Sequence, residues 1–110
     1  MKFHKTLVSA VIETLQQIFV EVVYADKAVE QVLKQNSRWG SRDRRFIAET
    51  TYEMVRWWRY IQHSGGIENP LHASDYWKLF ATWQILKEIE LPDWEEFKVI
   101  DKHQILKNAE

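Results

Sequence analysis

Apolar residues recur along most of this chain at the three- and four-residue steps of an α-helix. Residues at such steps share one helix face, which is then buried against the rest of the protein. The first such stripe predicts a helix from about His4 to Val22, and it consists of Phe3, Leu7, Val11, Leu15, Ile18 and Val22. The pattern contains no strand alternation and no internal repeat. It predicts an all-α bundle of about five helices with short joints.

The second and third helices are predicted from their start signals. Asp26 places a carboxylate at the positive N-terminal end of a helix that stops near residue 36. Ser41, directly after Gly40, is a good N-cap for the third and longest helix, which ends at the Gly65–Gly66 turn. Its inward face is expected to carry Phe46, Thr50, Met54, Trp57 and Ile61.

The last part of the chain predicts two further helices and a tail. Ser74 is a good N-cap for the fourth helix. Asp93 and Glu96 have the spacing of a capping box and predict a short fifth helix. Residues 1–100 are therefore expected to form one helical domain, and residues 101–110 a frayed C-terminal tail or the start of a linker.

Composition is that of a soluble globular domain. With 45% apolar and 28% charged residues in 110, the chain is long enough for one modest core. Cysteine is absent, which excludes disulfides and cysteine nucleophiles and fits a reducing cytoplasm, the expected location. No apolar run approaches the roughly 20 residues that span a bilayer, so no membrane partner is expected.

The net charge of −1 conceals an uneven distribution. Residues 1–63 carry ten Lys and Arg against seven Asp and Glu, whereas residues 64–110 carry five against nine. All six arginines fall within residues 36–59: Arg38, Arg42, Arg44, Arg45, Arg56 and Arg59. Because the guanidinium fork binds phosphate and carboxylate oxygens two at a time, this window is a candidate anion or nucleic-acid contact.

Helical geometry divides the arginines of the third helix. Arg42, Arg45, Glu49 and Arg56 share one face, whereas Arg44 projects elsewhere. Cations beside a helix N-terminus suit phosphate binding, because the free amides there also attract anions.

The residues that precede the helix allow two interpretations. Trp39, next to Arg38, would offer a stacking face to an unpaired base. Alternatively, Trp39 pins the turn onto the core, while Asp43 binds Arg38 or Arg44 internally. Spacing alone leaves both interpretations open.

Catalytic and metal-binding patterns are not evident. The four histidines have no partner at helical spacing and are interpreted as surface residues: His4, His63, His72 and His103. Glu49 and Glu53 are interpreted as members of an ion-pair ladder with Arg45 and Arg56. The chain alone is therefore not expected to be an enzyme, and no cofactor or metal is expected in it.

One segment carries a family resemblance. Ala25-Asp26 is followed by Gly40-Ser41-Arg42-Asp43-Arg44, and then by Tyr52 and Arg56. Residues 24–59 thereby resemble the N-terminal domain of Sun-type (RsmB-like) 16S rRNA cytosine-C5 methyltransferases. That domain is similar to the transcription antitermination factor NusB, an all-helical RNA-binding fold.

The resemblance implies a non-catalytic RNA-binding domain that helps to position rRNA. The residues expected to contact RNA are Arg38, Trp39, Arg42, Arg44, Arg45, Arg56, Lys2 and Lys5. In the family, a Rossmann-like S-adenosylmethionine domain with cysteines performs the methyl transfer, and this chain has neither. It is expected to be the front domain of a larger enzyme, with S-adenosylmethionine bound only in its own downstream methyltransferase domain, or a free-standing relative.

An alternative class is a protein-interaction or structural helical module, including a NusB-type antitermination relative. The acidic 88–101 stretch is poor for RNA and fits protein contact. NusB itself is associated with an arginine-rich N-terminus, whereas this chain has only Lys2, His4 and Lys5 there. The sequence does not predict the oligomeric state or the target nucleotide.

Overall fold

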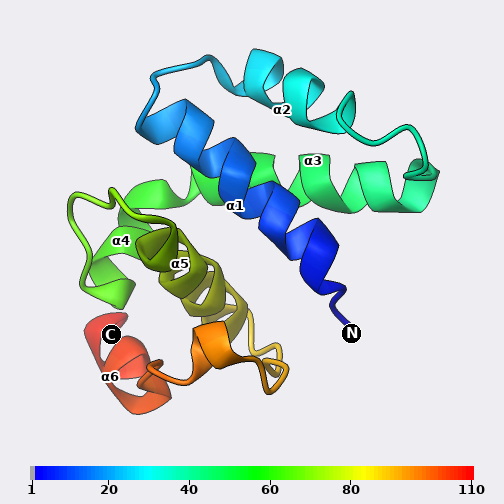
Figure 1. Cartoon of the computed structure of the whole chain (residues 1–110). Helices are drawn as coiled ribbons and strands as arrows, with labels where there is room; N and C mark the ends of the chain where they lie inside the picture. The colour runs from blue at the N-terminus through cyan, green and yellow to red at the C-terminus, as the bar shows by residue number, and fades with distance from the viewer. Residues whose placement is uncertain (1) are drawn as a thin grey trace. The chain divides into compact units, whose positions relative to one another are not determined.

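The computed structural model describes residues 2–110, and these residues contain helices, turns and loops but no strand, so the all-α prediction is confirmed. In chain order the elements are α1 (Lys5–Phe19), α2 (Ala25–Leu33), α3 (Ser41–Arg56), α4 (Trp58–Gly65), α5 (Ala73–Leu86), the 3₁₀ turn η1 (Glu95–Phe97) and α6 (Lys102–Asn108) (Figure 1). They form two compact units. We call Phe3–Arg56 the first unit, and Trp57–Glu110 together with Lys2 the second unit.

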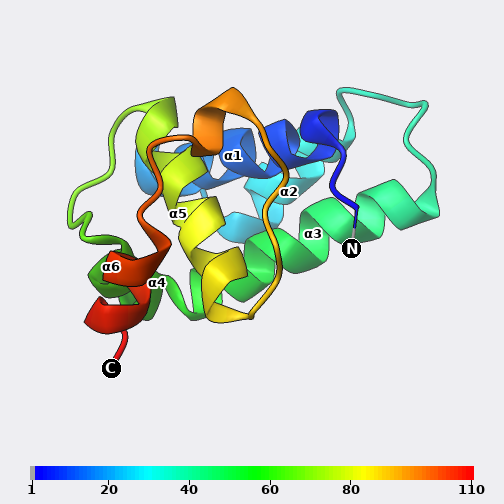
Figure 2. The ribbon, with the colours of Figure 1, turned by 90° about the horizontal axis from the view of Figure 1, so that it is seen from below.

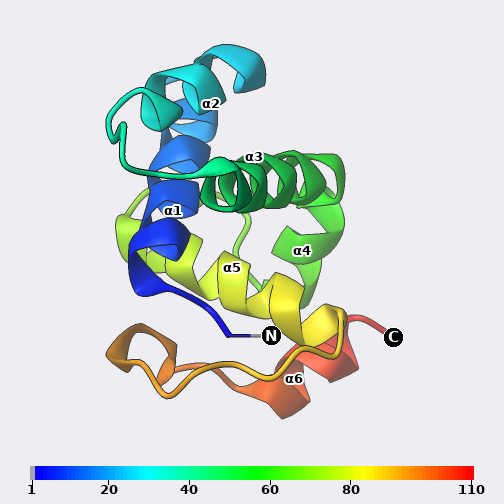
Figure 3. The same cartoon turned by 90° about the vertical axis from the view of Figure 1, so that its right-hand side faces the viewer.

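The first unit is a three-helix arrangement. Helices α2 and α3 run in opposite directions beside each other, and α1 contacts both (Figures 1 and 3). The buried face of α3 is narrow and consists of Ile47, Thr51 and Met54. Its other faces remain available for polar and charged side chains, because the three buried residues follow the helical steps of three and four.

Helix α1 ends earlier than its apolar stripe predicts. It stops at Phe19, and Val22 has a left-handed backbone with φ of 57° and a side chain that is 84% exposed. A left-handed residue ends a helix by turning the chain away, and here the amide of Val23 donates to the carbonyl of Gln17 at 2.9 Å. Val22 therefore does not belong to the buried stripe.

The predicted third helix is two helices, so that prediction is wrong. The chain breaks at Trp57, which has φ of −103° and ψ of 20°, and its carbonyl accepts from the amide of Ile61 to begin α4. The buried residues nevertheless keep the helical steps of four and three across the break, from Met54 to Trp58 and Ile61. Trp58 is 9% exposed, whereas Trp57, expected to face inward, lies beside that buried face and is 48% exposed.

In the second unit, α4 and α6 both contact α5 (Figure 2). Helix α5 begins at Ala73, one residue before the expected Ser74 cap, and His72 is its N-cap. The carboxylate of Asp75 accepts hydrogen bonds from the amides of Leu71 and His72, both at 3.1 Å. These bonds favour the charged carboxylate and lower the pKa of Asp75.

The predicted fifth helix is reduced to the single turn η1. The chain after α5 is extended and turns at residues 95–97, where aromatic packing decides the geometry (Figure 2). The ring of Phe97 stacks on Phe80 with centroids 6.2 Å apart, and it also contacts Trp77 and Trp94. A short isolated helix is only marginally stable in water. Packing of these aromatic rings therefore stabilises the segment more than a fifth helix would.

The expected frayed tail is an ordered helix, α6. Asp101 caps it by accepting from the amide of Gln104 at 3.1 Å. Ile105 is 6% exposed, and the side-chain amide of Asn108 donates to the carbonyl of Ser64 at 3.0 Å. Residues 101–110 thus pack within the second unit, against α4 and α5.

Candidate nucleic-acid interface

The turn before α3 is held by its own side chains. The carboxamide oxygen of Asn36 accepts from the amide of Arg38 at 2.9 Å, which is an Asx turn. The amide of Trp39 donates to the carbonyl of Asn36 at 3.3 Å. This arrangement leaves Arg38 exposed and Trp39 half-buried.

Gly40, rather than Ser41, is the N-cap of α3. Its carbonyl accepts the first helical hydrogen bond, from the amide of Arg44 at 3.0 Å, and Ser41 is the first helical residue. The Nε of Arg44 donates to the carbonyl of Trp39 at 3.1 Å. Arg44 is half-buried and ties the turn to the helix. Of the arginines predicted to contact RNA, Arg44 is therefore the one that holds the turn before α3 in place.

The other four predicted arginines are exposed, and we call them the arginine surface: Arg38, Arg42, Arg45 and Arg56. Within residues 2–110, no ion pair and no side-chain hydrogen bond engages any of their guanidinium groups. The proposed internal pairing of Arg38 with Asp43 is therefore not formed. From Arg42 to Arg56 the surface extends about 21 Å along the axis of α3, at 1.5 Å per residue.

The Arg45–Glu49 pair of the predicted ladder is also not formed. Arg45 and Glu49 are both exposed and stand one turn apart, yet no ion pair joins them among the described residues. Exposed pairs of this kind contribute only about 0.2–1 kcal/mol, so nothing strong holds them together. Glu49 nevertheless places one negative charge on the same helix face.

Tyr52 lies on this face between Arg45 and Arg56, seven and four residues away. Its ring is 41% exposed, and its hydroxyl donates to the carboxylate of Asp26 on α2 at 2.5 Å. This hydrogen bond raises the pKa of Tyr52 above its ordinary value of 10.0, because it favours the protonated phenol. The pair fastens the start of α2 to the second half of α3.

This bond predicts a pH-dependent contribution to stability. Because the pKa of Tyr52 is raised in the folded state, the contribution is present below the ordinary value and lost as pH rises through the folded value. Tyr52→Phe is expected to lower the free energy of unfolding by at most about 1 kcal/mol near neutral pH, since the pair is exposed. Urea unfolding of both proteins at neutral and at strongly alkaline pH measures this difference. A gap that widens at alkaline pH would contradict the assignment.

Lys2 and Lys5 flank a residue that packs on α3. Phe3 is 7% exposed and meets the ring of Phe46 edge-on, with centroids 6.2 Å apart. This contact holds Phe3 against the half of α3 that carries Arg42 and Arg45. Both lysines are exposed, and Lys5 has an intramolecular partner, so it is a weaker candidate than the arginines.

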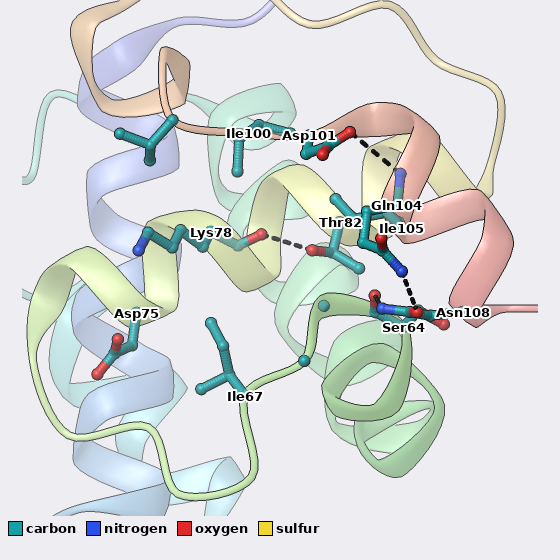
Figure 4. Close-up of a pocket in the computed structure, with 13 residues that line it drawn as sticks. Ser64, Ile67, Asp75, Lys78, Thr82, Ile100, Asp101, Gln104, Ile105 and Asn108 are labelled. Atoms are coloured by element: carbon teal, nitrogen blue, oxygen red, sulfur yellow. Dashed lines mark hydrogen bonds between the residues drawn. The ribbon is translucent and has the colours of Figure 1, made fainter.

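A cavity of about 280 Å³ lies in the second unit, where α4, α5 and α6 meet (Figure 4). The hydroxyl of Thr82 in its lining donates to the carbonyl of Lys78 at 2.8 Å, and Asn108 bonds to Ser64 as described above. The Ser64 hydroxyl is buried without a hydrogen-bond partner. Sequence patterns gave no signal for this cavity, and no predicted site residue lines it.

Other site types have no counterpart in the described residues. All four histidines are exposed, as predicted, and no cluster of three or more His, Asp or Glu side chains within residues 2–110 is arranged to hold a metal ion. No helix in this range has the length and apolar character needed to cross a membrane. Comparison of the chain with family models, curated proteins and solved structures finds no match in any of the three.

Proposed function

We propose that the chain is a non-catalytic RNA-binding domain that binds through the arginine surface. The observation that carries this proposal is the state of Arg38, Arg42, Arg45 and Arg56, which are exposed and have no carboxylate partner within residues 2–110. Arginines that stabilise a fold are usually paired with acids, whereas unpaired ones on one surface suit a polyanion. The N-terminal amides of α3 add positive potential at the same end.

The resemblance to Sun-type methyltransferase front domains supports rRNA as the RNA. Under this proposal the domain helps to position rRNA for cytosine-C5 methylation, and S-adenosylmethionine binds only in a downstream catalytic domain. Arg44 orients the turn, and Trp39, which is half-buried, is a further candidate contact. A cytoplasmic location follows from the same proposal.

Single substitutions test the assignment. Arg42→Ala and Arg45→Ala are each expected to reduce the slope of log Kobs against log salt by about 0.7–0.9, because each removes one phosphate contact. Glu49→Gln is expected to raise RNA affinity, since it removes the negative charge that shares their helix face. Fluorescence anisotropy with labelled RNA at several salt concentrations measures both effects.

Arg44→Ala serves as the internal comparison. Because its guanidinium binds the turn, this variant is expected to lower thermal stability more than Arg42→Ala does. Slopes that stay unchanged in Arg42→Ala and Arg45→Ala would remove these residues from the RNA contact. Absence of binding by the unsubstituted chain at low salt would favour the alternative, a protein-interaction module.

A further inference from the structure

We propose that Trp57, Arg59 and Tyr60 form a second RNA contact, a stacking platform for an unpaired nucleobase. We call these three residues the Trp57 platform. The inference rests on the proposed RNA-binding function and names the part of the RNA that is recognised. None of the three residues belongs to the arginine surface.

The first observation is that the ring of Trp57 is both stacked on another ring and exposed. Its ring stacks on Trp83 with centroids 6.4 Å apart and an angle of 22° between the planes, yet 48% of the residue is exposed. Trp83 is 7% exposed, so Trp57 is the outer member of the stacked pair. An aromatic ring held in place in this way has lost its rotational freedom before a ligand arrives, which lowers the cost of binding.

The second observation is the composition of the first turn of α4, which follows Trp57, and of the neighbouring part of α5. Tyr60, three residues on and in the first turn of α4, is 41% exposed. Arg59 is exposed and has no ion-pair partner within residues 2–110. The ammonium group of Lys87 on α5 lies 5.4 Å from the centroid of the Trp83 ring. Aromatic faces with adjacent cations are the combination that binds single-stranded nucleic acid.

Charge favours RNA over a protein as the occupant. The exposed cation next to the platform in sequence is Arg56, which ends the arginine surface and directly precedes Trp57. Within the second unit, Arg59 of the platform and Lys87 on α5 are both exposed cations, which suits a polyanion. A regular duplex hides the faces of its bases, so the platform selects unpaired nucleotides.

The test compares two variants at Trp57 on two RNAs. The probes are an oligouridine of about a dozen nucleotides, within the usual site sizes, and a duplex of the same length. Trp57→Leu keeps an apolar side chain but removes the aromatic face, and it is expected to weaken oligouridine binding about tenfold or more. Trp57→Phe keeps a ring and is expected to retain most of the affinity. Neither variant changes duplex binding or the salt slope.

Tyr24→Leu is the matched control, because Tyr24 is an exposed aromatic residue (88%) outside the platform. It is expected to bind both RNAs as the unsubstituted chain does. Equal oligouridine affinity of Trp57→Leu and the unsubstituted chain, with Arg42→Ala still weakened, would overturn the platform and leave the arginine surface intact. The platform would then suit a protein partner, since Trp, Tyr and Arg dominate such contacts. Absence of any RNA binding would overturn both.

A second measurement does not depend on the folding of a variant. Photocrosslinking of 5-iodouridine-labelled RNA to the unsubstituted chain, followed by peptide mass spectrometry, is expected to mark Trp57 or Tyr60. Crosslinks found only elsewhere would overturn the inference.

Discussion

Replacing Arg38, Arg42, Arg45 and Arg56 together by alanine is expected to weaken single-strand RNA binding about 10²–10³-fold near 0.1 M salt. Each phosphate contact contributes about 0.7 to the slope of log affinity against log salt, so four contacts remove about 2.8 from it. The fold is expected to survive, because all four side chains are exposed and none is paired within residues 2–110. Anisotropy titrations over a salt series measure the loss and the slope together.

A charge-matched variant separates a specific surface from net charge. Alanine at four exposed lysines outside the surface changes the net charge equally: Lys27, Lys98, Lys102 and Lys107. Under the proposal this variant loses much less affinity than the arginine variant. An equal loss in both would show that the RNA responds to overall charge and would contradict a defined contact.

Gly65→Ala is expected to destabilise the second unit by about 1–3 kcal/mol, through overpacking. A Cβ at this position would lie 2.9 Å from the hydroxyl oxygen of Thr82 and 3.4 Å from a methyl group of Leu79. Thr82 cannot turn away without losing its bond to the carbonyl of Lys78, and it is 1% exposed. Urea denaturation of the full chain measures the free energy of unfolding.

Two further variants make this prediction specific. Adding Thr82→Ala to Gly65→Ala removes the clashing atom, so the double variant is expected to lose less than the sum of the two single losses, by about 0.5–3 kcal/mol. Gly40→Ser has open space around its Cβ and supplies a preferred N-cap to α3, so it is expected to be neutral or stabilising. Additive losses at residues 65 and 82 would show that the close approach is not the cause.

The sequence predicts helices well here because helix signals are local. The stripe that contains Leu7, Val11 and Leu15 is recognisable from spacing, and these residues are buried in α1. Gly65–Gly66 marks the end of a helix for the same reason, and Gly66 has φ of 70°. Such signals depend on neighbours within one or two turns.

The predictions of secondary structure are wrong where contacts between residues far apart in the sequence determine the local structure. Trp57 and Trp58 are both apolar and adjacent, so periodicity could not show that the helix breaks between α3 and α4. The stacking of Trp57 on Trp83, 26 positions later, accompanies that break. Likewise, the weak pattern after residue 101 gave no sign that Ile105 is buried in the second unit.

The sequence predicted which residues make up the candidate interface, but not which of them are exposed and unpaired. Clustering of the arginines is visible in the sequence, whereas their pairing depends on rotamers and on the turn before α3. The Asx turn at Asn36 and the bond from Arg44 to Trp39 separate one positioning arginine from four exposed ones. The sequence shows that cations and aromatic residues are interspersed from Arg56 to Tyr60, and this was the available signal for the platform. It does not show that these side chains are exposed.

The most direct measurement is the affinity of the unsubstituted chain for a structured 16S rRNA fragment with unpaired loop nucleotides, taken at about 50 mM and about 200 mM salt. If arginines on the surface of the first unit hold phosphates, binding is clear at the lower concentration and falls steeply at the higher. No binding at the lower concentration, or an affinity that salt leaves unchanged, would contradict the account.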